Sequence, residues 1–310
     1  MDRERDVYYW QERSDIDILG YEWKEHIIFK IIDKEGFSGI GAATPDELYG
    51  ETFKTSMAIV ESLRRLTEKF YNLSFLEDFD DLMEKTVKKD MAAKCAVSLA
   101  VCDYMTGKKG LDITDILFPT RKIKQYSFKK IIVKKETDLS KYNLKNEKIK
   151  FEIFEEEDID FITDFINKFE SDCKIIDFRA SFDTFDVKHI LKKCDKNNIF
   201  AIEQPSKRGH EKNSEIFKNS YNIYWDESVE NTEDIIRLSK LSSGYITDIT
   251  KFGGILGIYK AFTLIQSYGK DSIISTRIEH PENIKWTKKI SRSFGITDTD
   301  IEKYILKTSK

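Results

Sequence analysis

Several features that would define a class of protein by themselves are missing from this sequence. It has no run of eighteen apolar residues, which excludes a membrane-spanning helix. Its first residues, MDRERDVYYW, are charged where a secretory signal peptide is apolar, so we expect a cytoplasmic protein without a membrane partner. Cysteine and histidine are scarce, with four of each and no CxxC, HExxH or HxH motif. Neither disulfide bonds nor a zinc site is therefore expected.

An excess of one charge is missing as well. The 310 residues contain 51 Lys and Arg against 55 Asp and Glu, and no basic block stands out, so the sequence predicts no nucleic-acid partner. Hydrophobic residues make up 40% of the chain and aromatic residues 13%, which is enough for a substantial core. The length predicts about two domains, or one barrel with an appended unit.

The first hundred residues have the pattern of an α+β unit. Apolar β-rich runs at residues 6–10 and 25–33 predict an antiparallel pair of strands. Apolar residues at helical spacing then predict helices at 56–71 and 89–106, the second of them ended by Gly107. We assign residues 1–106 to this N-terminal domain.

From about residue 125 the pattern changes to short β-rich runs separated by amphipathic helices. The runs begin near residues 126, 149, 174, 200, 222, 245, 272 and 294. Eight strands alternating with helices predict a parallel sheet closed into a barrel. Because this region is shorter than the roughly 250 residues of a typical barrel, short connections are expected. We therefore expect an α/β protein with a barrel domain at residues 107–310.

Three consecutive predicted strands end in an acid. Asp177, Glu203 and Asp226 each close an apolar run, and functional residues of parallel barrels lie at the C-terminal ends of strands. Neighbouring strands are about 5 Å apart, so the three carboxylates would repel one another unless a cation neutralised them. A hard divalent ion with oxygen ligands fits such a site, Mg²⁺ first and Mn²⁺ as the alternative. The other interpretation is that these acids cap the helices that follow.

Two lysines stand at a spacing of two on the preceding predicted strand, so Lys148 and Lys150 share a face. Burial beside a metal site would lower a lysine pKa and make the amine a usable base. In this interpretation Lys150 carries the base chemistry, and Lys148 helps to hold a substrate carboxylate or to lower the pKa of its neighbour. The alternative is a solvated strand edge in a lysine-rich chain.

Taken in order, these residues resemble a known family. The segments Lys148-Ile-Lys150, Ala201-Ile-Glu203-Gln204-Pro205, Trp225-Asp226-Glu227-Ser228 and Lys251-Phe-Gly253-Gly254 are similar to motifs of the enolase superfamily, in its muconate-lactonising-enzyme branch. Residues 41–45 and 49–52 resemble the capping domain of that branch, so the likeness covers nearly the whole chain. It implies a modified (β/α) TIM-type barrel with an N-terminal α+β capping domain, Mg²⁺ held by Asp177, Glu203 and Asp226, and Lys150 as base.

The chain departs from the family's pattern at two places that concern the site. The family's second catalytic lysine stands five residues before the glycine pair, and that position is Asp248 here. Lys251 follows three residues later, so we expect it not to point into the same site. Phe178 and Arg179 follow the metal aspartate where the family usually has Ala-Asn.

Asp248 bears on the expected reaction and joins Lys148 and Lys150 among the catalytic candidates. Epimerisation needs two opposed bases, whereas syn dehydration through an enediolate intermediate needs one lysine. The sequence therefore favours a Mg²⁺-dependent carbon–oxygen lyase similar to the o-succinylbenzoate synthases of menaquinone biosynthesis. An Ala-Glu dipeptide epimerase or related racemase is the first alternative, and a catalytically impaired member of the superfamily is the second.

The expected partner is a small-molecule carboxylate substrate, and the sequence leaves a monomer and a homo-oligomer equally open. Ser275 and Arg277, on the seventh predicted barrel strand, are the candidates for substrate binding. An inward Arg277 would bind a second substrate carboxylate, whereas an outward one would form a surface salt bridge.

Overall fold

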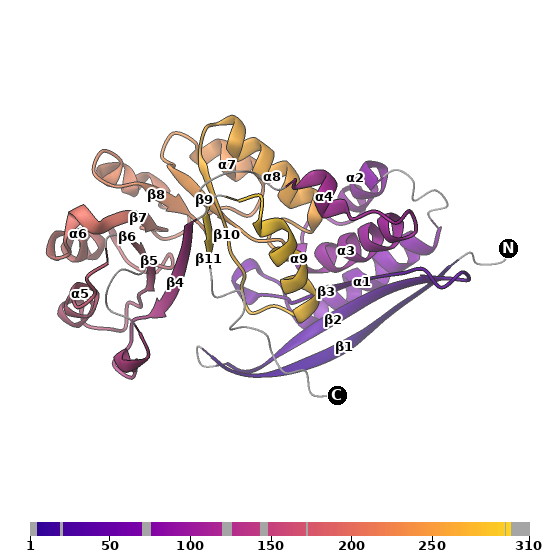
Figure 1. Ribbon diagram of the computed structural model, residues 1–310, viewed down its shortest axis with the longest axis horizontal. Coiled ribbons are helices and arrows are strands. Elements are labelled where there is room, and N and C mark those ends of the chain that lie inside the picture. The colour runs from indigo at the N-terminus through magenta and orange to yellow at the C-terminus, as the bar shows by residue number, and fades with distance from the viewer. Residues whose placement is uncertain are drawn as a thin grey trace.

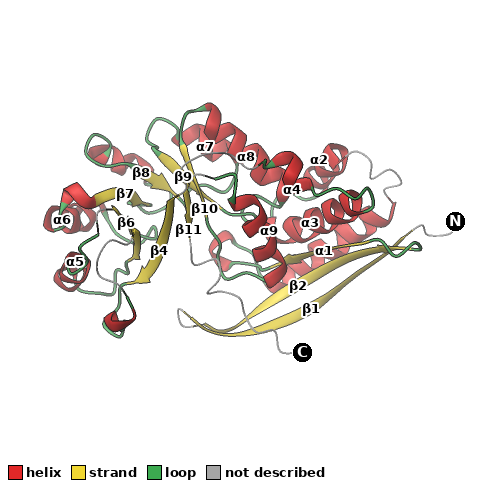
Figure 2. Cartoon of the chain, in the orientation of Figure 1, coloured by secondary structure: helices red, strands yellow, loops and turns green. Residues whose placement is uncertain are grey.

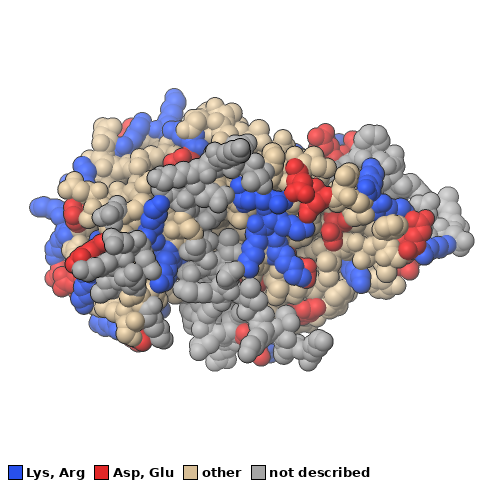
Figure 3. Space-filling view, viewed as in Figure 1, with Lys and Arg blue, Asp and Glu red and all other residues tan. Residues whose placement is uncertain are grey.

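The computed structural model describes residues 5–18, 21–69, 76–119, 126–142, 148–171, 173–294 and 296–298. An antiparallel sheet with its helices lies beside a barrel (Figure 1). Helices surround the barrel strands on the outside (Figure 2). On the face drawn in Figure 3, basic and acidic side chains are interspersed over the described part of the surface.

The N-terminal sheet has three antiparallel strands in the order β1 (Arg5–Ile18), β2 (Tyr21–Asp33) and β3 (Ser38–Ala43). The predicted pair is confirmed, and both of its strands are longer than the apolar runs indicate. The pattern gives no sign of β3, because Gly39, Gly41 and two alanines are poor strand formers. Packing explains the small residues: a Cβ at Gly39 or Gly41 would lie 2.1 Å from a backbone oxygen of Ala100 or Ala96.

Three helices pack on this sheet or on one another. They are α1 (Phe53–Lys69), α2 (Leu76–Thr86) and α3 (Met91–Gly107), with the short turn η1 (Glu47–Tyr49) before them and α4 (Ile113–Leu117) after them. Residues 70 and 71, which the sequence assigns to the first helix, lie outside the described residues. Helix α3 ends at Gly107 as predicted.

Helix α3 belongs to two hydrophobic cores at once. Ala92, Val97 and Ala100 pack in the core of the N-terminal sheet, whereas Cys95 and Leu99 pack in the core between the barrel and its helices. A helix between two layers is apolar around its whole circumference, which is the pattern of α3. The domain boundary at residue 106 therefore stays a prediction, because the helix that ends there serves both units.

The barrel consists of eight parallel strands. They are β4 (Tyr126–Ile132), β5 (Lys148–Glu152), β6 (Cys173–Asp177), β7 (Ile199–Glu203), β8 (Ile223–Trp225), β9 (Gly244–Thr247), β10 (Asp271–Ile274) and β11 (Ile296–Asp298). They close in the ring order β10-β11-β4-β5-β6-β7-β8-β9, and β9 pairs with β10. Each strand begins within two residues of its predicted start.

Short connections explain how so few residues close a barrel. Helices α5 (Ile159–Asn167), α6 (Thr184–Lys193), α7 (Thr232–Leu238), α8 (Ile255–Ser267) and α9 (Pro281–Ser291) follow β5, β6, β8, β9 and β10. In the described residues, β4 is followed by the single turn η2 (Leu139–Lys141). The turn η3 (Lys196–Asn198) leads into β7, and η4 (Glu211–Phe217) follows β7. No helix in the described ranges has the length and apolar character needed to cross a membrane.

Candidate functional site

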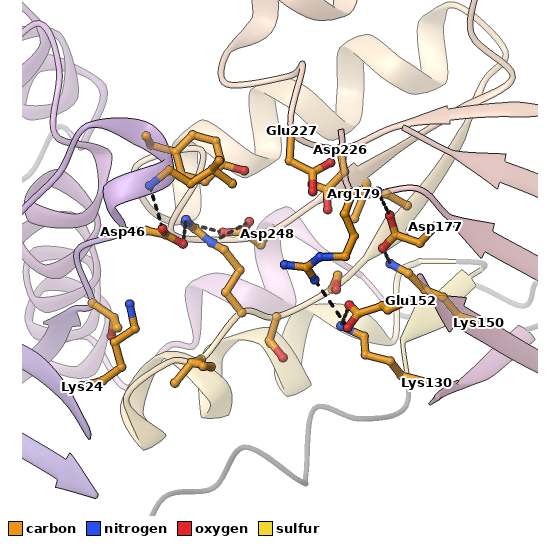
Figure 4. Close-up of a pocket in the computed structure, with 18 of the residues that line it drawn as sticks. Lys24, Asp46, Lys130, Lys150, Glu152, Asp177, Arg179, Asp226, Glu227 and Asp248 are labelled. Carbon is orange, nitrogen blue, oxygen red and sulfur yellow. Dashed lines mark hydrogen bonds and ion pairs between the residues drawn. The ribbon is translucent and has the colours of Figure 1, made fainter. Parts of the chain in front are cut away.

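A cavity of about 280 Å³ lies where the C-terminal ends of the barrel strands meet the loop before α1. Acidic and basic side chains from several strands project into it (Figure 4). Asp46 and Tyr49 belong to the loop from the N-terminal unit, and Asp177, Asp226 and Asp248 come from the barrel. Arg179 also lines the cavity, whereas Phe178 is buried in the core between the barrel and its helices.

The three predicted metal ligands stand at strand ends, as the sequence indicates. Asp177 is the last residue of β6, Glu203 is the last residue of β7, and Asp226 follows β8. Asp177 pairs directly with Glu203 in the sheet register. The side chains of Asp177 and Glu203 are almost completely buried.

None of these acids caps a helix. Helix α6 is capped by Asp183 and α7 by Asn231, while His210 precedes η4. The helix-cap interpretation of the strand-end acids is therefore wrong. Their burial beside the cavity calls for another explanation.

Lys150 connects two of the acids. It lies inside β5 with 4% of its surface exposed, and its Nζ is 2.5 Å from Glu203 Oε1 and 3.2 Å from Asp177 Oδ2. The alternative of a solvated strand edge is therefore wrong for Lys150. Lys148 begins the same strand, is only partly buried and does not line the cavity, so its assigned role stays a prediction.

Burial and mutual repulsion dominate the electrostatics of the acids. Burial raises the pKa of Glu203 well above its usual range, and Asp177 raises it further against the opposing effect of Lys150. Burial also acts to raise the pKa of Asp226, but Lys251 and Lys150 lower it overall. Glu227 lines the cavity beside Asp226, and its pKa is raised to about 8 by burial and by Asp226 and Asp177.

The expected orientation of Lys251 is wrong. Its Nζ lies 2.6 Å from Asp226 Oδ1 and also donates to the backbone oxygen of Ile246 at 2.9 Å, with the side chain almost fully buried. The expectation rested on strand alternation, but β9 ends at Thr247 and Lys251 lies in the turn beyond it. A long lysine side chain in that turn reaches back to the strand ends.

Asp248 faces Lys150 across the barrel, because β5 and β9 are four places apart in a ring of eight strands. Its Oδ1 accepts a hydrogen bond from the backbone of Lys251 at 2.6 Å, and Arg277 Nε lies 3.4 Å from its Oδ2. Arg277 Nη1 also lies 3.1 Å from Asp46 Oδ2. Arg277 therefore points inward and joins the barrel to the N-terminal loop. Ser275 lines the same cavity.

Sequence reasoning missed a second group of charges in the cavity. Lys130 Nζ lies 2.9 Å from Glu152 Oε1, and Arg179 Nη1 lies 3.5 Å from Glu152 Oε2. Although burial acts to raise the pKa of Glu152, Lys130, Arg179 and Lys150 lower it to about 2. The signal was in the sequence, because Glu152 follows Lys150 at the same spacing of two and so shares its face.

The donor set suits a hard divalent cation. Glu203 Oε2 and Glu227 Oε2 are buried without a hydrogen-bond partner, and such orphaned carboxylate oxygens are natural ligands for Mg²⁺. In the described residues, however, no three Asp, Glu, His or Cys side chains are arranged to hold a metal ion as they stand. Instead, the ammonium groups of Lys150 and Lys251 form ion pairs with Glu203 and Asp226. The carboxylate oxygens are therefore suitable ligands for a divalent cation, and its binding requires the two lysine side chains to move away from them.

No family model matches the chain. A mandelate racemase/muconate lactonizing protein from Herpetosiphon aurantiacus superposes with a TM-score of 0.82, covering 97% of this chain and 89% of that one at 15% identity. The chain therefore shares the fold of that protein.

Two further comparisons are with epimerases. A dipeptide epimerase from Enterococcus faecalis V583, solved with Mg and the dipeptide L-Leu-L-Tyr, has a TM-score of 0.81 at 18% identity and covers 99% of this chain and 92% of its own. The L-Ala-D/L-amino acid epimerase of Flavobacterium johnsoniae is 26% identical over 231 residues, which are 72% of this chain and 67% of that protein.

Proposed function

We propose that this chain is a divalent-metal-dependent enzyme that removes the α-proton of a small carboxylate substrate, and that it epimerises or racemises a dipeptide-like molecule. One observation carries the proposal: the buried amine of Lys150 stands among the strand-end acids, with Asp248 on the opposite wall of the cavity. Acid–base groups on both sides of a substrate carbon are what inversion at that carbon requires.

Lys150 is the base on one side. Its Nζ contacts two carboxylates, and release from them would leave the amine free to accept a proton. Asp177, Glu203 and Asp226 would hold Mg²⁺ or Mn²⁺, which supplies a positive centre for the substrate carboxylate. Asp248 returns a proton from the other side, and Arg277 keeps its carboxylate oriented toward the cavity. Tyr49 closes the pocket against the barrel mouth.

The comparisons support the epimerase alternative better than the o-succinylbenzoate synthase-like reaction that the sequence favours. The proteins from Flavobacterium johnsoniae and Enterococcus faecalis are both epimerases, and neither is a lyase. The expectation that Asp248 prevents epimerisation assumed that only a lysine can serve there. A carboxyl group can also carry a proton to carbon, although its oxygen is a weaker base than an amine.

One observation favours dehydration as the second candidate. Asp248 Oδ1 accepts a backbone hydrogen bond at 2.6 Å, and both its oxygens lie within 3.4 Å of the Arg277 guanidinium. An acid whose two oxygens are already engaged by a backbone amide and a guanidinium group is poorly placed to pass a proton to a substrate carbon. Lys150 would then act alone, and one base is sufficient for syn elimination.

Product analysis separates the proposals. The purified protein is incubated with Mg²⁺ and either L-Ala-L-Glu or the cyclohexadiene substrate of o-succinylbenzoate synthases. We expect chiral chromatography to show a mixture of dipeptide epimers and no aromatic product. An aromatic absorbance without epimers would establish dehydration instead. If neither product forms, the catalytically impaired alternative holds and the proposed function is wrong.

A further inference from the structure

Arg179 occupies a strained turn directly after β6. Its φ is 52° and that of Ala180 is 56°, so two consecutive non-glycine residues adopt the left-handed conformation. The backbone amide of Arg179 donates to Asp177 Oδ1 at 2.9 Å, and Ser181 closes the turn by donating to Phe178 O at 3.1 Å. Strain of this kind persists where the surroundings fix a functional geometry. Here it directs the Arg179 side chain into the cavity (Figure 4).

Among Arg179, Lys130, Lys150, Lys251 and Arg277, the guanidinium group of Arg179 has the longest ion-pair distance. Lys130 lies 2.9 Å from its acid, Lys150 2.5 Å, Lys251 2.6 Å and Arg277 3.1 Å, whereas Arg179 is 3.5 Å from Glu152. Glu152 is shared, because its other oxygen is bound by Lys130. The Arg179 side chain is 33% exposed, so part of the guanidinium surface is accessible from the cavity.

The surroundings hold this group in place and leave it charged. Its Cζ lies 4.8 Å from the centre of the Phe154 ring, which provides a flat support for a guanidinium plane. Although burial acts to lower the pKa of Arg179, Glu152, Asp177, Glu227 and Asp226 raise it. These acids include two of the three proposed metal ligands, so the arginine lies beside the place where a substrate carboxylate would bind.

The two departures from the family pattern are complementary in charge. The end of β9 has an acid where the family has a lysine, and the end of β6 has an arginine where the family usually has a neutral residue. One positive charge is absent from one wall of the cavity and one is added to another. We propose that Arg179 binds the substrate carboxylate next to the reacting α-carbon, and so replaces the cation that β9 lacks. This inference rests on the proposed function for its choice of substrate.

The planar guanidinium can bind a carboxylate through two parallel N–H groups, which a lysine cannot do. Removal of these charged hydrogen bonds should weaken binding roughly ten- to hundred-fold. The effect should be confined to ligands that carry the carboxylate. This restriction distinguishes a contact with the ligand from a structural role.

The test measures binding, with Mg²⁺ present, of L-Ala-L-Glu and of the same dipeptide with its α-carboxylate converted to an amide. Calorimetry is performed on the wild type, R179M, R179K and the control R237M. Arg237 pairs with Asp234 on helix α7 and does not line the cavity. We expect R179M to lose roughly ten- to hundred-fold in affinity for the acid and little for the amide. R179K should be intermediate, and R237M should match the wild type.

Equal loss of acid and amide in R179M would overturn the inference, because it would indicate a general change of the pocket. A wild type that binds the acid no better than the amide, or that binds neither, would also overturn it. If the charge preference appears and depends on Arg179 but no epimer forms, the proposed function fails while the assignment of Arg179 stands. Thermal unfolding of each variant confirms that the binding is measured on folded protein.

Discussion

At the scale of single residues, the cavity is an array of cations and acids supplied by different strands. Lys150 on β5 binds acids of β6 and β7, and Lys251 beyond β9 binds the acid that follows β8. Each lysine therefore neutralises carboxylates that a divalent ion would also neutralise. The lysine amines and the ion compete for the same oxygens, and this competition can be measured.

The first prediction concerns that competition. In Lys150→Met one positive charge leaves the site, so Mg²⁺ should bind as tightly as in the wild type or more tightly. Glu203→Gln removes a ligand and should weaken Mg²⁺ binding strongly, because a neutral amide oxygen is a poorer partner than a carboxylate. Isothermal calorimetry measures both. Weaker binding in Lys150→Met would mean that the lysine supports the ion site and does not compete with it.

The second prediction concerns Asp248. In Asp248→Asn the proton donor on the β9 side is lost, so formation of the opposite epimer should fall by roughly a hundred-fold or more. Lys150 should still exchange the α-proton of one epimer in D₂O. Asp46→Asn is the control, because it removes the other acid partner of Arg277 without touching β9. Unchanged epimerisation in Asp248→Asn would exclude this residue as the second acid–base group.

Glu279 gives a pH dependence at the same scale. Burial raises its pKa to about 7, and Asp248 adds to this effect while Arg277 opposes it. The contacting neutral groups are Thr250 and Asn283, and the buried thiol of Cys95 faces the same cluster. The folded protein thus binds this proton more tightly than the unfolded chain, whose Glu titrates near the usual 4.5.

The third prediction follows from that sign. Stability contributed by protonated Glu279 is present below pH 4.5 and is lost as the pH rises through about 7. The loss amounts to roughly 3 kcal/mol. Glu279→Gln should remove it, so the variant should gain stability over the wild type between these pH values. Urea unfolding at several pH values measures the gain, with the exposed Glu233→Gln as control. If the free energies of unfolding of Glu279→Gln and the wild type change with pH in parallel, the raised pKa of Glu279 is refuted.

At the scale of elements, the turn between β9 and α8 fixes how closely the two units approach. Gly254 has φ 112°, and a Cβ there would lie 2.5 Å from Ser98 Oγ on α3. The glycine pair thus has a packing role that is separate from chemistry. It lets the turn that follows β9 and contains Asp248 lie against the helix shared by both cores.

The fourth prediction tests this contact. Gly254→Ala should lower the free energy of unfolding by roughly 2–5 kcal/mol, because it adds both backbone strain and a steric clash. Gly110→Ala is the matched control, since Gly110 has φ 67° but no atom within 4 Å of its Cβ position. It should cost only the strain, about 1 kcal/mol. Denaturant unfolding compares them, and equal costs would mean that the approach of α3 is not tight.

Elements with strong periodicity could be predicted from the sequence, and contacts that depend on turns could not. The barrel strands were predicted because β-branched apolar runs recur at regular intervals. Strand β3 gave no signal, because close packing on α3 selects glycine and alanine there. Lys251 and Arg179 both lie in turns beyond strand ends, where the alternation rule no longer gives side-chain direction. The left-handed backbone of Arg179 could not be inferred from its neighbours.

At the scale of the whole molecule, the site exists only where the two units meet. The barrel supplies the acids and lysines, and the N-terminal loop supplies Asp46 and Tyr49. Arg277 bridges them by its ion pairs with Asp46 and Asp248, and its Cζ lies 4.7 Å from the ring centre of Tyr49. Substrate entry must therefore involve this boundary, and the chemistry requires both units.

The proposed function requires metal-assisted proton abstraction by Lys150 in this cavity. It is measured most directly as exchange of the α-proton of L-Ala-L-Glu in D₂O, followed by proton NMR with and without Mg²⁺. We expect Mg²⁺-dependent loss of that signal with the wild type, and a loss slower by orders of magnitude with Lys150→Met. Exchange that continues undiminished in Lys150→Met, or no exchange by the wild type with Mg²⁺ bound, would contradict it.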